Sequence, residues 1–247
     1  MEKIIKKVVN NVEFKIHVKS SNEVATDYIT RFFSKDKHNI KFNVVYSDSL
    51  SLSYVTSWID DNKEQLFDEY TRYFYKNGIT RFEYTEGEKH AYLGKEYPLK
   101  INIVDKTGVC NIDLLGDHFV VNISKSLPNH NHVIPLLLKK WYENKAYIYF
   151  KERTELYRKK MDFVPEGDII IKIVDVNKYH GRCTWGKRLI EYNYPVIKLS
   201  KDIIDYLVVH ELCHFKEHNH KPPFWRLVRK YCTHYAYLDR QINIENI

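Results

Sequence analysis

Residues 202–214 read Asp-Ile-Ile-Asp-Tyr-Leu-Val-Val-His-Glu-Leu-Cys-His, and this stretch decides what the carboxy-terminal half of the chain can be. Its apolar residues recur around most of a 3.6-residue period, which predicts a helix over residues 202–216 that is buried on most sides. Asp202 is the predicted N-cap, and Asp205 at the third helical position also suits the positive end of the helix dipole. A buried helix of this kind holds its side chains in fixed positions.

The segment ends in an H-E-x-x-H motif formed by His210, Glu211 and His214. Residues four apart lie one turn apart on the same helix face, so the two imidazoles are predicted to bind one Zn²⁺ while Glu211 reaches its bound water. The motif is short enough to arise by chance in histidines that only fill a core or a surface. The apolar approach and the capped start favour the metal site.

A tetrahedral zinc ion with two histidine ligands needs a third ligand from elsewhere in the protein. The nearby candidates are Glu217, His218 and His220. His220 is the first choice, since it follows the predicted helix end and a chain that turns back there can bring it to the metal. His218 is the second choice.

This site predicts hydrolytic chemistry. Zinc lowers the pKa of a bound water and polarises the scissile carbonyl, and Glu211 accepts the proton of that water as general base. A further donor for the developing oxyanion is usual. The sequence leaves six candidates open for it, each with a structural role as its alternative: Tyr179, His180, Arg182, Tyr194, His234 and Tyr235.

The rest of the chain predicts an α+β fold, with a small β-rich amino-terminal region ahead of the helical segment. Alternating or apolar runs predict strands at 12–18, 40–45, 91–93, 97–104, 109–114, 119–123, 169–174 and 194–200, and helices at 53–75, 134–161 and 222–235. No repeat or low-complexity linker is present. A soft boundary near residue 125 therefore separates residues 1–125, of unknown role, from the catalytic domain predicted over 126–247.

Charge is unevenly distributed. Residues 1–125 hold 18 Lys and Arg against 18 Asp and Glu, whereas residues 126–247 hold 21 against 14, which accounts for the whole net charge of +7. Such an excess suits acidic substrates or nucleic acid. The basic residues are scattered or in short runs, so a solvated surface is the favoured explanation.

Cysteine spacing and hydropathy indicate the compartment. The four cysteines form neither a C-x-x-C pair nor a dense disulfide framework, which favours free thiols. No apolar run has the length of a membrane span, and the Lys-rich start lacks the pattern of a signal peptide. A cytoplasmic location without membrane association is expected.

The segment 204–214, followed by Asn219-His220-x-x-x-Phe224-Trp225, resembles the I-D-Y-V-V-V-H-E-L-C-H and N-H-x-x-x-F-W motifs of the YgjP-like metallopeptidases, relatives of the SprT and WLM zincins. Residues 92–99, Tyr-Leu-Gly-Lys-Glu-Tyr-Pro-Leu, are similar to the strand pair of that family, and Trp141-Tyr142 to the start of a helix in it. The resemblance covers roughly residues 12–235. It implies His210, His214 and His220 as zinc ligands, Glu211 as catalytic acid and base, and a minimal zincin-like core.

One loop departs from the family pattern R-W-G-S-C, because residues 182–188 read Arg-Cys-Thr-Trp-Gly-Lys-Arg. The loop would lie near the cleft, so the departure bears on substrate choice more than on metal binding. Arg182, Trp185 and Tyr194 are the candidate substrate-binding residues, with a simple packed turn as the alternative for Trp185.

Three functions are open to this site. The first is a zinc metallopeptidase that acts on an extended polypeptide laid along an edge strand at 196–199. The second is a nucleoside triphosphate pyrophosphohydrolase that uses the same metal, although no glycine-rich phosphate loop is present. The third is a SprT-like protease associated with DNA, against which the scattered charge argues.

Overall fold

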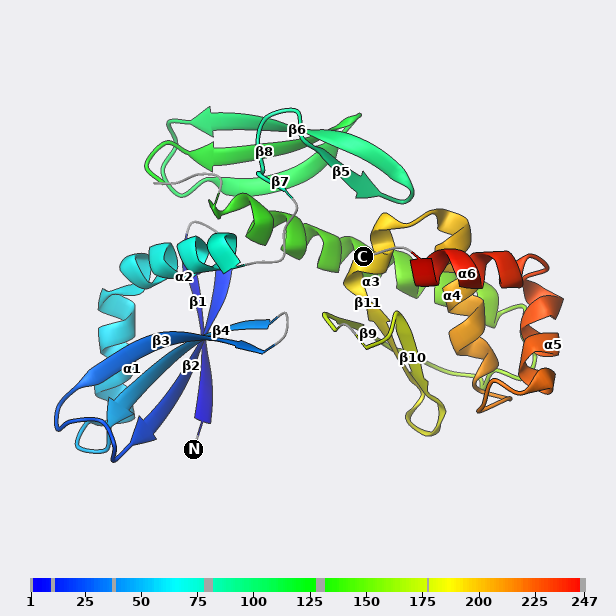
Figure 1. Ribbon diagram of the computed structural model, residues 1–247, viewed down its shortest axis with the longest axis horizontal. Coiled ribbons are helices and arrows are strands. Elements are labelled where there is room, and N and C mark those ends of the chain that lie inside the picture. Colours follow the sequence, from blue (N-terminus) through cyan, green and yellow to red (C-terminus); the bar gives the residue numbers. More distant parts are fainter. Residues whose placement is uncertain are drawn as a thin grey trace. The chain divides into compact units, whose positions relative to one another are not determined.

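The computed structural model describes residues 2–9, 12–36, 39–77, 82–127, 132–176 and 178–244. Two compact units form, Met1–Glu88 with Pro98–Leu138, and Lys89–Tyr97 with Lys139–Ile247. Strands dominate the first unit and helices the second, which confirms the predicted α+β class with a β-rich amino-terminal part (Figure 1). The boundary near residue 125 stays a prediction. Among the described helices, none combines the length and the hydropathy needed to cross a membrane.

The first sheet has the order β1-β2-β4-β3. Its strands are β1 (Glu2–Val9), β2 (Val12–Ser21), β3 (Ile29–Asp36) and β4 (Asn39–Ser47). The central strands β2 and β4 are parallel, and each pairs with its outer neighbour in antiparallel fashion. These two strands are the ones predicted from residues 12–18 and 40–45, whose buried side chains, such as Phe14 and Phe42, give the strongest apolar signal.

Two helices, α1 (Leu52–Asp61) and α2 (Lys63–Asn77), follow this sheet, so the single helix predicted over 53–75 is wrong. The break is at Asn62, whose backbone N–H and side-chain amide both donate to the carbonyl of Trp58, at 3.1 and 2.8 Å. This capping ends α1. Helix α2 packs its aromatic side chains on the sheet, with the Phe14 and Phe67 ring centroids 5.4 Å apart.

The next sheet has the order β5-β6-β8-β7. Its strands are β5 (Lys89–Tyr92), β6 (Lys95–Val104), β7 (Cys110–Leu115) and β8 (His118–Ser124). The turn between β5 and β6 has Leu93 and Gly94 at φ 49° and 78°, the left-handed region in which glycine carries no steric cost. This turn belongs to the second unit.

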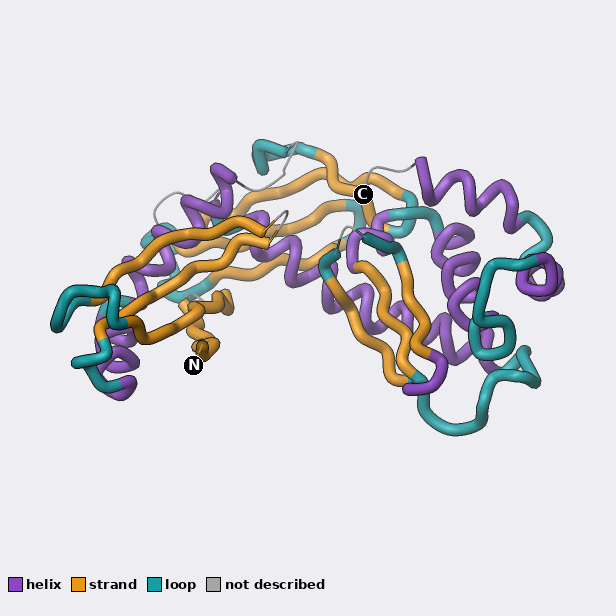
Figure 2. The backbone as a smooth tube through the Cα atoms, turned by 60° about the horizontal axis from the view of Figure 1, so that its bottom comes forward, coloured by secondary structure: helices purple, strands orange, loops and turns teal. Residues whose placement is uncertain are grey.

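In the described residues, the second unit contains β5, a three-stranded sheet, four α-helices and two short 3₁₀ helices. Its elements are most of α3 (Ile134–Arg158), β9 (Ile170–Val174), β10 (Gly181–Thr184), η2 (Trp185–Lys187), β11 (Leu189–Asn193), η3 (Tyr194–Lys198), α4 (Lys201–Cys213), α5 (Pro222–Tyr231) and α6 (Tyr235–Ile244). The strands lie side by side in the order β10-β11-β9, so β10 is an edge strand (Figure 2). Helix α4 contacts β10, α5 and α6.

The strand predicted at 194–200 is wrong, because residues 194–198 form the 3₁₀ helix η3. Pro195 at its start has no N–H to give to a strand ladder, and Val196 and Ile197 are buried as they would be in a strand. The apolar run therefore reports burial and not strand geometry. The carbonyls of Ile197 and Lys198 accept hydrogen bonds of 3.0 Å from the backbone of the β5–β6 turn.

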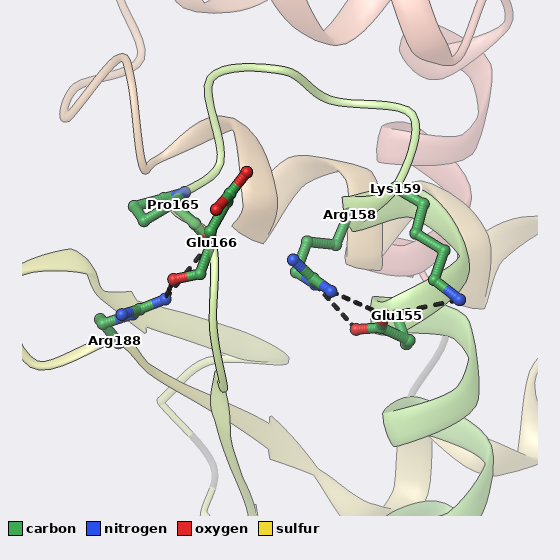
Figure 3. A network of polar contacts seen from close by, with 6 residues as sticks. All are labelled: Glu155, Arg158, Lys159, Pro165, Glu166 and Arg188. Atoms are coloured by element: carbon green, nitrogen blue, oxygen red, sulfur yellow. Dashed lines mark hydrogen bonds and ion pairs between the residues drawn. The ribbon is translucent and has the colours of Figure 1, made fainter.

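The loop between α3 and β9 is held by Arg188, which follows η2 (Figure 3). Its guanidinium donates to the backbone carbonyls of Pro165 and Glu166. At the end of α3, Arg158 makes a two-pronged ion pair with Glu155, with both nitrogen to oxygen distances 2.7 Å. These contacts fix the connection that leads into the sheet beside α4.

Candidate metal centre

Helix α4 begins at Lys201, and its N-cap is Ser200, not the predicted Asp202. The Ser200 hydroxyl accepts from the backbone N–H of Ile203 at 3.4 Å, which satisfies one of the free donors of the first turn. Further along, Asp205 accepts two hydrogen bonds from Arg153 of α3, at 2.6 and 2.5 Å. The helix is thus fixed at its start and on the side that faces α3.

The structure brings His210, His214 and His220 together, with one ligating atom of each within 4.8 Å of the others. His210 lies in the last turn of α4, His214 is its C-cap, and His220 lies just before α5. The Nε2 atoms of His210 and His220 are 2.9 Å apart. Three imidazole nitrogens therefore converge on one point, as the sequence predicted for the first-choice set.

The segment after α4 carries His220 back to the helix because α5 anchors it. Trp225 Nε1 donates to the backbone carbonyl of His220 at 3.0 Å. The buried ring of Phe224 packs under the cluster, 4.9 Å from the His210 ring centroid and 4.6 Å from that of His214. In the N-H-x-x-x-F-W motif, Phe224 therefore packs against the histidine rings, and Trp225 holds the backbone of His220.

Contacts on the far side of the rings orient two of the histidines. His214 Nδ1 donates to the backbone carbonyl of Glu217 at 3.0 Å, which leaves Nε2 with its lone pair. His210 Nδ1 lies 3.3 Å from the hydroxyl of Tyr206. Both rings are held with Nε2 toward the cluster, the arrangement that metal-binding histidines adopt.

Burial favours the neutral form of two of the three imidazoles, His210 and His214. Burial lowers the pKa of His210 to about 3, with smaller contributions from the neighbouring His214 and His220. Burial also lowers the pKa of His214, although its bond to the Glu217 carbonyl opposes the shift. A neutral imidazole is the form that binds a cation, so these two side chains have the protonation state that a metal site requires.

Glu211 is 3% exposed and lies against the edge strand β10. The backbone N–H of Cys183 donates to its carboxyl group. A Cβ atom at Gly181 would lie 2.6 Å from Glu211 Oε1, so the absence of a side chain at Gly181 makes room for the carboxyl. Burial raises the pKa of Glu211 to about 8, and the Cys183 bond only partly offsets this.

The three candidate substrate-binding residues lie in different settings. Arg182 is bound to the buried carboxylate of Glu191, with Nε 2.8 Å from the carboxylate oxygen. The Trp185 ring is 50% exposed and stacks on His218, with centroids 4.0 Å apart. Tyr194 begins η3, and Lys139 Nζ lies 5.8 Å from its ring centroid. Their roles stay predictions.

Three of the remaining candidates, His218, Tyr179 and Tyr235, have structural contacts of their own. His218, the second choice for the third ligand, donates from Nδ1 to the His214 backbone carbonyl at 2.9 Å. Its Nδ1 is therefore engaged outside the cluster. Tyr179 lies 3.4 Å from Glu191, and Tyr235 stacks on Trp225 with centroids 5.4 Å apart.

Three contributors to the site were missed at the sequence level. Tyr206 precedes His210 by four residues, so helical spacing alone could have placed its hydroxyl beside that ring. Gly181 is an isolated glycine before a strand, which signals a close approach of another group. Asp239, whose carboxylate accepts from Tyr206 at 2.5 Å, lies in α6, a helix that the sequence did not predict.

Paired imidazoles at the end of a buried helix, a third imidazole beside them and a buried carboxyl next to them are the side chains that metal-dependent hydrolases of the H-E-x-x-H type use. The family model described as "YgjP-like, metallopeptidase domain" matches residues 30–245. The chain belongs to this YgjP-like family of metallopeptidases, as the resemblance predicted.

Two solved structures are similar to part of the chain. The metallopeptidase zymogen abylysin of Pyrococcus abyssi is 21% identical, with a TM-score of 0.33, over 38% of this chain and 90% of that one. The metallopeptidase zymogen jannalysin of Methanocaldococcus jannaschii is 20% identical, also with a TM-score of 0.33, over 38% of this chain and 97% of that one. No curated protein matches the sequence.

Proposed function

We propose that the protein is a zinc-dependent peptidase of the zincin type, in which His210, His214 and His220 hold the metal and Glu211 is the general base. The observation that carries this proposal is the convergence of three imidazole nitrogens within 4.8 Å beside a buried carboxyl. The second unit would then be a minimal zincin-like core, built around α4.

The donor set suits zinc. Three imidazoles without a fourth protein ligand are the pattern of catalytic and not of structural zinc sites. Zinc bound there would acidify a water molecule, polarise the substrate carbonyl and favour the ionised form of Glu211.

Glu211 would act in two steps. Its carboxylate accepts the proton of the attacking water and then delivers a proton to the amine that leaves. Contact with Gly181 and the Cys183 N–H holds the carboxyl in one position, and burial excludes bulk water from one side of it. In the metal-free protein, burial raises the pKa of Glu211 to about 8, and zinc beside it would lower that pKa toward the carboxylate form that accepts the proton.

An extended polypeptide has a natural place along β10. The edge strand expected at 196–199 is a 3₁₀ helix, so it does not offer an unpaired strand edge. β10 pairs only with β11 in its sheet, and the Cys183 N–H points to Glu211 and not into that ladder. Addition of a substrate strand at this edge would bring its peptide bonds next to the candidate base.

Metal content tests the ligand set. Purified wild-type protein should bind one zinc ion per chain, and His220→Ala should lose most of it. His218→Ala is the matched control, because His218 lies next to the cluster but is engaged with the His214 carbonyl. Loss of zinc in the control together with retention in His220→Ala would make His218 the third ligand.

Cleavage of an unfolded polypeptide tests the reaction. Glu211→Gln should abolish cleavage while zinc stays bound, since the amide keeps the shape but cannot accept the proton. Equal cleavage by wild type and variant would refute the role of Glu211. The family match does not support the nucleotide and DNA-associated alternatives, and phosphate release from nucleoside triphosphates would be needed to revive the first of them.

A further inference from the structure

We propose that Tyr206 and Asp239 are positioning residues that hold His210 in the tautomer required for metal binding, so that α6 is part of the metal site. This inference rests on the proposed function, in which His210 is a zinc ligand. It extends the site from His210 through the buried Tyr206 hydroxyl to Asp239 on α6.

The Tyr206 hydroxyl connects His210 to Asp239. The Tyr206 hydroxyl lies 3.3 Å from His210 Nδ1 and 2.5 Å from Asp239 Oδ1. Tyr206 is 2% exposed, and it sits one helical turn before His210 on α4, where their ring planes are 75° apart. Asp239 comes from α6, which contacts α4. The hydroxyl is therefore held between two fixed partners.

The direction of each hydrogen bond follows from the chemistry of the groups. A carboxylate only accepts, so the Tyr206 O–H donates to Asp239. The hydroxyl oxygen is then left as the acceptor for His210, whose Nδ1 must carry the proton.

The tautomer of His210 matters because its other ring nitrogen, Nε2, faces His220. His210 Nε2 is 2.9 Å from His220 Nε2, where two lone pairs must be available for one cation. If Nδ1 lost its acceptor, His210 would also populate the form with the proton on Nε2, which would donate to His220 and close the site. Partners of this kind are worth about 10- to 100-fold in metal affinity.

The experiment compares Tyr206→Phe and Asp239→Asn with wild type by two readouts. The zinc dissociation constant is measured by competition with a chelator, and the protonated nitrogen of His210 is identified from ¹⁵N chemical shifts in the metal-free protein. Tyr206→Phe should weaken zinc binding about tenfold or more and shift His210 toward the Nε2-protonated form. Asp239→Asn keeps an acceptor oxygen and should give a smaller change in the same direction.

Tyr157→Phe is the matched control. It removes another hydroxyl that donates to an aspartate of the same unit, here Asp205 at 3.1 Å, without a contact to the cluster. The control should leave both readouts unchanged. Should Tyr206→Phe fail to fold, Asp239→Asn decides, since Asp239 is only half-buried.

The experiment distinguishes a failure of the proposed function from a failure of the positioning role. Wild-type protein that binds no zinc refutes the proposed function, while the nitrogen shifts still decide the tautomer. Wild-type protein that binds zinc, with Tyr206→Phe unchanged in both readouts, overturns the positioning role and leaves the function intact. Weaker zinc binding with an unchanged tautomer also overturns it, because the effect would then be a general loosening of the helix.

Discussion

Replacing Gly181 with alanine should displace the carboxyl group of Glu211. The added Cβ would lie 2.6 Å from Oε1 and 3.0 Å from both Cδ and Cγ of Glu211. Ordinary contact begins at 3.4 Å, so the carboxyl must retreat by about 0.8 Å or β10 must move by a similar amount. Because Glu211 is buried, it has little room to retreat without losing its bond to Cys183.

The size of the effect follows from this displacement. A misplacement of about 1 Å at a reacting group can cost on the order of 100-fold in rate. We therefore expect kcat/KM for an unfolded polypeptide to fall by about 10- to 100-fold, or about 1.4 to 2.7 kcal/mol of transition-state stabilisation. Overpacking should also lower the stability of the metal-free protein by about 1 to 3 kcal/mol. Zinc stoichiometry should stay at the wild-type value.

Gly186→Ala is the control, because a Cβ at Gly186 would meet nothing within 4 Å. Peptide cleavage, zinc content and denaturant unfolding are measured for both variants. Wild-type cleavage and stability in Gly181→Ala would refute the inferred contact between β10 and Glu211. Loss of zinc in that variant would mean that the change spreads to the histidines and is not confined to the base.

Three further outcomes are expected. The pKa of Glu211 is about 8 in the folded metal-free protein against 4.5 for the free group. Between these pH values the folded state holds one more proton than the unfolded state, so the free energy of unfolding should fall as pH rises from 4.5 to 8. Glu211→Gln should remove up to about 4 kcal/mol of this pH dependence, measured by urea unfolding at pH 5 and pH 8. Gly94→Ala should destabilise the second unit by about 2 kcal/mol or more, because φ is 78° and a Cβ would lie 2.8 Å from Ser200 Cα; an unchanged melting temperature would contradict this. Cys110 and Cys213 are buried, and burial raises the pKa of both thiols to about 12. Both should therefore react with a thiol reagent at pH 8 only after unfolding, and rapid labelling of the native protein would count against their burial.

The structure explains two sequence motifs that lie outside the H-E-x-x-H segment, Tyr-Leu-Gly and Phe-Trp. Glycine in the Tyr-Leu-Gly motif is required because the β5–β6 turn lies directly on the start of α4, against the N-cap Ser200. Phe224 and Trp225 pack against the histidines and hold His220. Neither role is catalytic chemistry, yet both bear on where the imidazoles lie. This explains why a family resemblance based on the metal site extends to residues well upstream of it.

Sequence alone determined the local part of the site. The spacing of His210 and His214, one helical turn apart, follows from the 3.6-residue period, and the apolar residues before them require a buried helix. Family membership and the α+β class could also be read from residue patterns. These properties depend on neighbours in the chain, which is why they are visible without a structure.

Tertiary structure decided the contacts between residues far apart in sequence. The partner of Tyr206 is 33 residues away, and the backbone that holds Glu211 comes from β10, an element separated from α4 by three others. Apolar patterning did not distinguish the 3₁₀ helix η3 from a strand, because both bury the same side chains. Which strand lies beside Glu211, and which side chain lies beside His210 Nδ1, depend on packing, and packing is not encoded in any local period.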